Sequence, residues 1–98
     1  AFSKMHTNTS VEIEQSKMTA NMEKYAVFST QTALEQFSNG RDVAIFLSDE
    51  FDKKYGRSWH CIIGQFHHTI NHDRNCFAIL RAGDEKIMLY RTGNAFIY

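Results

Sequence analysis

Residues 50–64 read EFDKKYGRSWHCIIG, and the hydrophobic pattern changes its period within this stretch. As far as Tyr55, apolar residues recur three or four positions apart, as they do on one face of a helix. The segment from Trp59 to Ile63 is typical of a strand, which Gly64 interrupts. Gly56 lies between the two segments and is a natural C-terminal stop for a helix. The stretch therefore predicts a helix that leads directly into a strand.

The helix that ends at this junction has a clear start and one apolar face. Ser38 or Asn39 can cap it, and Asp42 lies near the positive end of its dipole. The apolar stripe consists of Val43, Phe46, Leu47, Phe51 and Tyr55. Such a stripe needs a partner layer on which to pack.

Two acid-before-base pairs, four positions apart, are expected on the same helix. Asp49 precedes Lys53, and Glu50 precedes Lys54. Each pair should add about 0.3 kcal/mol to helix stability.

A strand and a second helix are predicted upstream. Val11–Gln15 alternates apolar and charged residues, as an edge strand does. Thr19 offers an N-cap for the helix that follows. The residues at helical spacing are Met22, Tyr25, Ala26, Ser29, Ala33 and Phe37. The segment 38–40 interrupts this helix, and residues 1–10 are a loose polar tail.

Further strands are predicted downstream of the junction. Phe66–His72 can form one, and Cys76–Arg81 with Lys86–Tyr90 can form a hairpin around a turn at residues 82–85. Two consecutive helices followed by consecutive strands predict an α+β fold, in which two helices pack on an antiparallel β-sheet. The chain ends in an apolar segment, residues 94–98, which could be disordered, cover a sheet edge or occupy a groove.

Composition limits the size of the domain and its partners. The 98 residues suffice for one domain, which buries only about 60–65% of its unfolded surface and would gain core by oligomerising. Eleven basic and eleven acidic residues give a formal net charge of zero, so no nucleic-acid partner is expected. No apolar run approaches the ~18 residues of a membrane span, and no signal peptide is evident, so no membrane insertion is expected.

The cysteines and histidines do not predict a metal site or a catalytic centre. Cys61 and Cys76 lack metal-ligand spacing and are expected to be buried free thiols rather than a disulfide. His68 and His72 share a strand face but lie about 13 Å apart along it, too far to share one ion. His60 and Cys61 are neighbours in a strand and point to opposite faces, so they cannot form a thiol–base pair. We therefore expect no metal, no cofactor and no enzymatic activity.

Residues 50–64 closely resemble the signature of the small cytoplasmic dynein light chain family. The match includes Trp59, His60 and Cys61 in order, and such rare residues make it specific. It extends more weakly from about Val11 to Gly93. The resemblance divides the chain into a tail at 1–10, a light-chain-like domain at 11–93 and a short apolar tail at 94–98.

The resemblance implies an adaptor that dimerises by exchanging a strand. In that family each protomer lends one strand to the sheet of the other, and partner peptides add as an extra strand along it. An unpaired strand edge suits this role, because an extended peptide satisfies its N–H and C=O groups. The implied partners are a second copy and disordered segments of other proteins, among them the dynein intermediate chain. The implied location is cytoplasmic and cytoskeleton-associated, in microtubule motor complexes.

The resemblance also implies which residues form the site. The lent strand is Phe66, His67, His68, Thr69, Ile70, Asn71 and His72. The start of the second helix, where free N–H groups can meet a ligand glutamine, is Gly40, Arg41 and Asp42. Groove-side positions on the hairpin are Phe77, Ile79, Arg81, Lys86 and Met88, and Tyr90 shares their face. The implied dimer interface contains His60, Ile62, Phe66 and Thr69.

The groove departs from the family pattern. The family has glycine, serine and tyrosine where this chain has His67, His68 and Thr69, and one residue is missing before Phe66. Ile79 and Arg81 replace tyrosines and Lys86 replaces a small residue, so the groove gains cations. We expect a preference for acidic flanking residues or weaker binding of glutamine-centred motifs. Arg81 and Lys86 could also be no more than a solvated rim.

Two other interpretations bear on function. Thr30-Gln31-Thr32 spells the ligand motif that the family favours, but it falls within a predicted helix, so chance explains it better. The chain begins at Ala1 without an initiator Met, which fits an excised domain. The alternative function is thus a C-terminal light-chain-like domain of a larger calcium-binding protein of the flatworm tegument type, with an altered or lost groove. No calcium loop occurs within these 98 residues.

Overall fold

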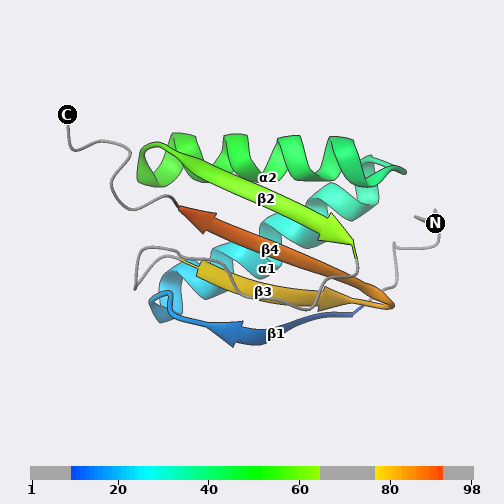
Figure 1. Cartoon of the computed structure of the whole chain (residues 1–98), viewed down its shortest axis with the longest axis horizontal. Coiled ribbons are helices and arrows are strands. Elements are labelled where there is room, and N and C mark those ends of the chain that lie inside the picture. Colours follow the sequence, from blue (N-terminus) through cyan, green and yellow to red (C-terminus); the bar gives the residue numbers. More distant parts are fainter. Residues whose placement is uncertain (1–9, 65–76, 92–98) are drawn as a thin grey trace.

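A computed structural model of the chain describes residues 10–64 and 77–91 (Figure 1). The elements are β1 (Val11–Ser16), α1 (Ala20–Gln36), α2 (Gly40–Tyr55), β2 (Trp59–Gly64), β3 (Phe77–Ala82) and β4 (Glu85–Arg91). The described strands form one sheet in the order β1-β3-β4-β2, and each neighbouring pair is antiparallel. Both helices lie on the same face of this sheet (Figure 1). The predicted α+β class, with two helices on an antiparallel sheet, is confirmed.

The helix boundaries follow from capping residues in the sequence. Thr19 caps α1, and its Oγ1 accepts a hydrogen bond of 3.2 Å from the Met22 N–H. Of the two predicted caps for α2, the structure uses Asn39, whose Oδ1 accepts the Asp42 N–H at 2.9 Å. Gly56 ends α2 with a φ of 87°, a conformation that favours glycine.

The predicted passage from helix to strand is held by contacts across the junction. The Asp52 Oδ1 accepts the Trp59 N–H at 2.8 Å, which ties the last turns of α2 to the first residue of β2. The Trp59 ring lies edge-on to Phe51, with centroids 4.8 Å apart. Arg91 of β4 also contacts both sides of the junction. Its guanidinium carbon lies 5.8 Å from the Trp59 ring, and its Nη1 donates to the Tyr55 carbonyl.

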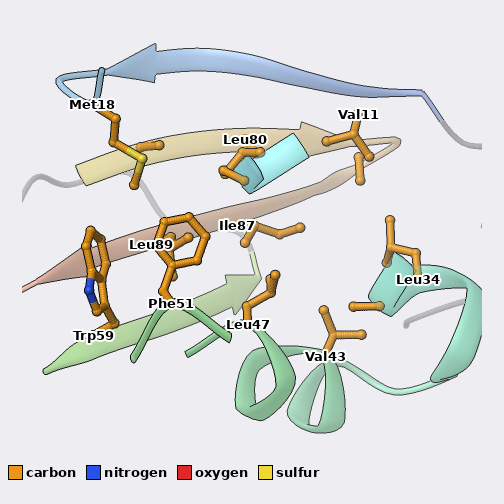
Figure 2. Close-up of a cluster of buried hydrophobic side chains, with 14 residues drawn as sticks. Val11, Met18, Leu34, Val43, Leu47, Phe51, Trp59, Leu80, Ile87 and Leu89 are labelled. Carbon is orange, nitrogen blue, oxygen red and sulfur yellow. The ribbon is translucent and has the colours of Figure 1, made fainter. Parts of the chain in front are cut away.

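The core lies between the helix layer and the sheet (Figure 2). From α2, Val43, Leu47 and Phe51 are fully buried, as their spacing in the sequence predicts. The sheet side of the same cluster consists of Val11, Trp59, Ala78, Leu80, Ala82, Ile87 and Leu89. Cys61 and Ile63 also pack against it, so every second residue of β2 from Trp59 onward faces the helices, and His60 and Cys61 lie on opposite faces as predicted.

The predicted charge pairs on α2 are wrong, because the prediction considered α2 without its neighbour. The hydroxyl of Tyr25, from α1, donates to Glu50 Oε1 at 2.8 Å. Glu50 Oε2 pairs with Lys53 at 3.4 Å, which replaces the expected pairing of Lys53 with Asp49. Lys54 places its ammonium 4.8 Å from the centre of the Tyr25 ring. Burial, reinforced by the hydrogen bond to Glu50, raises the pKa of Tyr25.

The predicted hairpin is present, with a shorter turn. Ala82 pairs with Glu85, so Gly83 and Asp84 alone connect β3 and β4. Gly83 has a φ of 64°, and glycine at the first central position is typical of a type II′ turn. The short turn fixes the register that places Ile79 opposite Met88.

Replacing Phe51 with alanine should destabilise the fold severely. The ring is fully buried and contacts the rings of Tyr25, Tyr55 and Trp59. Truncating it should lower the free energy of unfolding by about 3–5 kcal/mol, from lost transfer energy and the cavity left behind. Urea denaturation followed by Trp59 fluorescence measures this loss. The matched control is Phe28→Ala, because Phe28 is 63% exposed; its effect should stay within about 0.5 kcal/mol.

Candidate functional site

The sheet face that points away from the helices carries a second apolar cluster. Phe77, Ile79 and Met88 are buried there, and Tyr90 packs against them. The register explains the cluster, because Phe77 lies opposite Tyr90 and Ile79 lies opposite Met88. These positions alternate with Leu80 and other residues of the helix-covered core. The predicted division of the hairpin into two faces is confirmed; the binding role of the outward positions stays a prediction.

β2 extends this outward face to one edge of the described sheet. His60 lies opposite Tyr90, with the two rings 5.4 Å apart and inclined by 30°. Ile62 lies opposite Met88 and is 40% exposed, which is unusual for a residue beside a buried cluster. These are the two described residues of the predicted dimer interface. They lie together, on the strand whose outer edge has no neighbour among the described strands.

A group of three charges occupies the other side of the outward face. Glu14 Oε2 accepts a hydrogen bond of 3.2 Å from Arg81 Nε and lies 3.1 Å from Arg81 Nη2. Glu14 Oε1 lies 3.3 Å from the ammonium of Lys86. The hydrogen bond from Arg81 lowers the pKa of Glu14, and Lys86 adds to the effect. The cations predicted to enrich the groove are thus already paired with a carboxylate of this chain.

Sequence reasoning missed Glu14 as part of the site. Its place follows from an irregularity in the pairing of β1 with β3, where Ile13 lies opposite Leu80 and Gln15 opposite Ile79. Glu14 is the extra residue of this bulge. A bulge cannot be predicted from the alternation of Val11–Gln15 alone, although an acidic edge strand next to a basic hairpin was a visible signal.

The start of α2 forms the third part of the candidate site. Figure 1 shows that α2 begins at the end of the molecule where β2 finishes. The predicted ligand-binding residues here are Gly40, Arg41 and Asp42. Asn39 already accepts the Asp42 N–H, and its Nδ2 donates to the Asp42 carboxylate at 2.9 Å. A ligand carbonyl would therefore have to meet the N–H of Gly40 or Arg41, the other orphan donors of the first turn.

The predicted lent strand, residues 66–72, lies outside the described residues. Phe66, His67, His68, Thr69, Ile70, Asn71 and His72 therefore stay predictions, both as groove residues and, for Phe66 and Thr69, as dimer contacts. Cys76 lies outside as well.

The described residues show neither a reactive thiol nor a metal cluster. Burial raises the pKa of the Cys61 thiol to about 12, so the thiol is protonated at neutral pH and is a poor nucleophile. Within residues 10–64 and 77–91, no three His, Cys, Asp or Glu side chains gather closely enough to hold a metal ion. Neither helix described in the structure is both long and apolar enough to cross a membrane. Thr30 and its neighbours lie inside α1, and Thr30 is fully buried, as expected for a chance motif.

Comparison with known proteins connects this arrangement to one family. The family model described as Dynein light chain type 1 matches residues 10–92. Two similar solved structures are of the dynein light chain-like domain of the Fasciola hepatica calcium binding protein FhCaBP2. The mercury derivative has a TM-score of 0.73 and 21% identity, covering 85% of this chain and 92% of that chain. The native crystal has a TM-score of 0.73 and 20% identity, covering 87% and 93%. At such low identity, the likeness shows the fold.

Removing the cap of α2 should loosen the helix start at the candidate site. Asn39→Ala loses both hydrogen bonds to Asp42 and should lower the free energy of unfolding by about 1 kcal/mol. Thermal or urea denaturation measures the change. Ser38→Ala is the matched control, since Ser38 precedes the cap and is exposed; it should change stability by less than about 0.5 kcal/mol. Equal losses in the two variants would contradict the assignment of Asn39 as the cap.

Proposed function

Because the chain belongs to the dynein light chain type 1 family, we propose that it is a non-catalytic, dimeric adaptor that binds extended segments of partner proteins by β-strand addition. Two copies exchange the segment 66–72, and each exchanged strand pairs with β2 of the other copy. The outer edge of the exchanged strand then accepts the partner peptide. The family supports a cytoplasmic location and partners in motor complexes, such as the dynein intermediate chain.

One observation carries the proposal: among the described strands, β2 lies at an edge of the sheet, and its outward face exposes the apolar side chain of Ile62. Ile62 is 40% exposed and borders the cluster of Phe77, Ile79 and Met88. An open edge presents unpaired N–H and C=O groups, which favour pairing with a further strand. Covering Ile62 and that edge in a dimer would also add buried area to a domain of only 98 residues. Both effects favour association through β2.

A permanent charge at position 60 should dissociate the proposed dimer. His60 lies at the β2 edge beside Tyr90, where a dimer would exclude water from the ring. A charge in such a site is costly to desolvate, so His60→Lys should be monomeric. Light scattering coupled to size exclusion measures the mass.

Two variants control for this effect. His60→Phe keeps a ring beside Tyr90 and adds no charge, so it should remain dimeric. Gln36→Lys adds the same charge as His60→Lys at the exposed end of α1 and should leave the dimer intact. A monomeric wild-type chain at neutral pH would contradict the proposed dimer.

The altered groove should prefer peptides with acidic residues near the Arg81 end. A partner carboxylate there would compete with Glu14, which holds both Arg81 and Lys86. Glu14 therefore acts as an internal competitor, and its removal would leave two cations for the partner. This intramolecular pairing also explains how a domain can carry these cations without exposing an unpaired positive patch.

Calorimetric titration with an acidic peptide and its neutral amide counterpart tests this preference. The acidic peptide should bind more tightly at low salt, and Glu14→Gln should strengthen its binding about two- to fivefold, the worth of one exposed ion pair. Glu35→Gln is the matched control, because it removes one exposed carboxylate at the far end of α1. Equal affinities for both peptides in wild type and Glu14→Gln would overturn the proposed specificity.

A second candidate function is that of a light-chain-like domain within a larger calcium-binding protein. The two similar structures favour it, because both are light chain-like domains of a calcium binding protein. The altered residues of the predicted groove fit a domain whose peptide binding has changed or been lost. The sequence of the full-length transcript separates the two functions: calcium-binding loops encoded upstream of this domain would favour the second.

A further inference from the structure

The helix layer carries an exposed aromatic ridge between two hollows. Lys24 and Phe28 of α1 line both of them, and Phe28 is 63% exposed. One hollow, of about 410 Å³, lies between α1 and β1, where Ile13 and Val27 line it. The other, of about 550 Å³, lies between the two helices. The ridge is far from the outward sheet face, because the helices cover the opposite face of the sheet (Figure 1).

The hollow between the helices combines aromatic walls with two cations. Its lining consists of Asn21, Lys24, Tyr25, Phe28, Lys54 and Tyr55 and includes no acidic residue. The ammonium of Lys54 lies 4.8 Å from the centre of the Tyr25 ring and 6.0 Å from that of Tyr55. Among the described residues, the ion pairs engage Lys53, Arg81 and Lys86, and neither Lys24 nor Lys54. The hollow thus presents two cations that form no salt bridge with the described residues.

We propose that this surface of α1 and α2 docks an acidic amphipathic helix of a partner protein. Apolar side chains on one stripe of that helix pack against Phe28, Tyr25 and Tyr55. Carboxylates that flank the stripe pair with Lys24 and Lys54, whose charges they complement. The site is separate from the β2 edge, so this inference does not rest on the adaptor function proposed above.

The charges disfavour two other occupants. A second copy placed symmetrically on the ridge would bring Lys24 and Lys54 of both chains together, which like-charge repulsion opposes. An anionic membrane would be met by only two lysines, Lys24 and Lys54, and one large exposed apolar residue, Phe28. The whole chain adds no net positive charge to attract such a surface. An acidic helix satisfies the cations and the apolar ridge together.

Nuclear magnetic resonance titration of the 98-residue chain tests the proposal. The probe is a synthetic helix of about sixteen residues with leucine at i, i+3, i+4 and i+7 and glutamate on its flanks, a pattern that makes one apolar stripe. Amide shifts should change at Lys24, Phe28 and Lys54. Phe28→Ala and the charge reversal Lys24→Glu/Lys54→Glu should each weaken binding at least about tenfold, as loss of a central aromatic or a charge pair does.

Three comparisons make the outcome decisive. A probe with lysine in place of glutamate should not bind, and Ile45→Ala, which removes another exposed apolar side chain on α2, should bind as wild type does. Shifts confined to β2, β3 and β4 would assign the peptide to the sheet face and overturn the proposal. Equal binding of the acidic and basic probes, or no binding at millimolar peptide, would also overturn it. The proposal would fail as well if vesicles with anionic lipid shifted the same amides and the acidic helix did not.

Discussion

The β3–β4 hairpin must bury apolar side chains on both of its faces, and the other elements are arranged around this constraint. Leu80, Ile87 and Leu89 meet the helices, whereas Ile79 and Met88 are buried on the opposite face. A strand with two apolar faces is stable only at the centre of a sheet, and β3 and β4 are the central strands here. The helix layer can cover one face only. The outward cluster of Phe77, Ile79 and Met88 therefore needs cover from groups other than the two helices.

Local sequence patterns predicted the elements well because each depends on nearby residues. Thr19 and Asn39 cap helices through side chains that reach only three residues ahead. Gly56 and Gly83 mark the helix end and the hairpin turn by their positive φ values. The inward face of α2 follows from period alone, since Leu47 and Phe51 recur at helical spacing. The fold class then follows from the order of helices and strands.

Contacts between distant segments could not be predicted in the same way. Glu50 was expected to pair with Lys54, but it accepts a hydrogen bond from Tyr25 and pairs with Lys53. This follows from the packing of α1 against α2, which the sequence pattern within α2 does not reveal. Glu14 and Arg81 are 67 positions apart, and they meet only through a bulge in β1. The sequence therefore predicted two cations on the hairpin but not their pairing with Glu14. Two cations read from the hairpin become, with Glu14, a cluster of smaller net charge.

The two proposed surfaces differ in how they depend on the fold. The β2 edge uses backbone groups, so its affinity rests on register and on the position of His60 and Ile62. The surface around Phe28 uses side chains of α1 and α2. Phe28 itself can change without loss of the core, because it is exposed while its neighbours Ala26, Ser29 and Thr30 are buried. Because the two proposed surfaces lie on different layers, a partner on one need not cover the other. A domain of this size can then link two different segments, provided that its central hairpin keeps both faces buried.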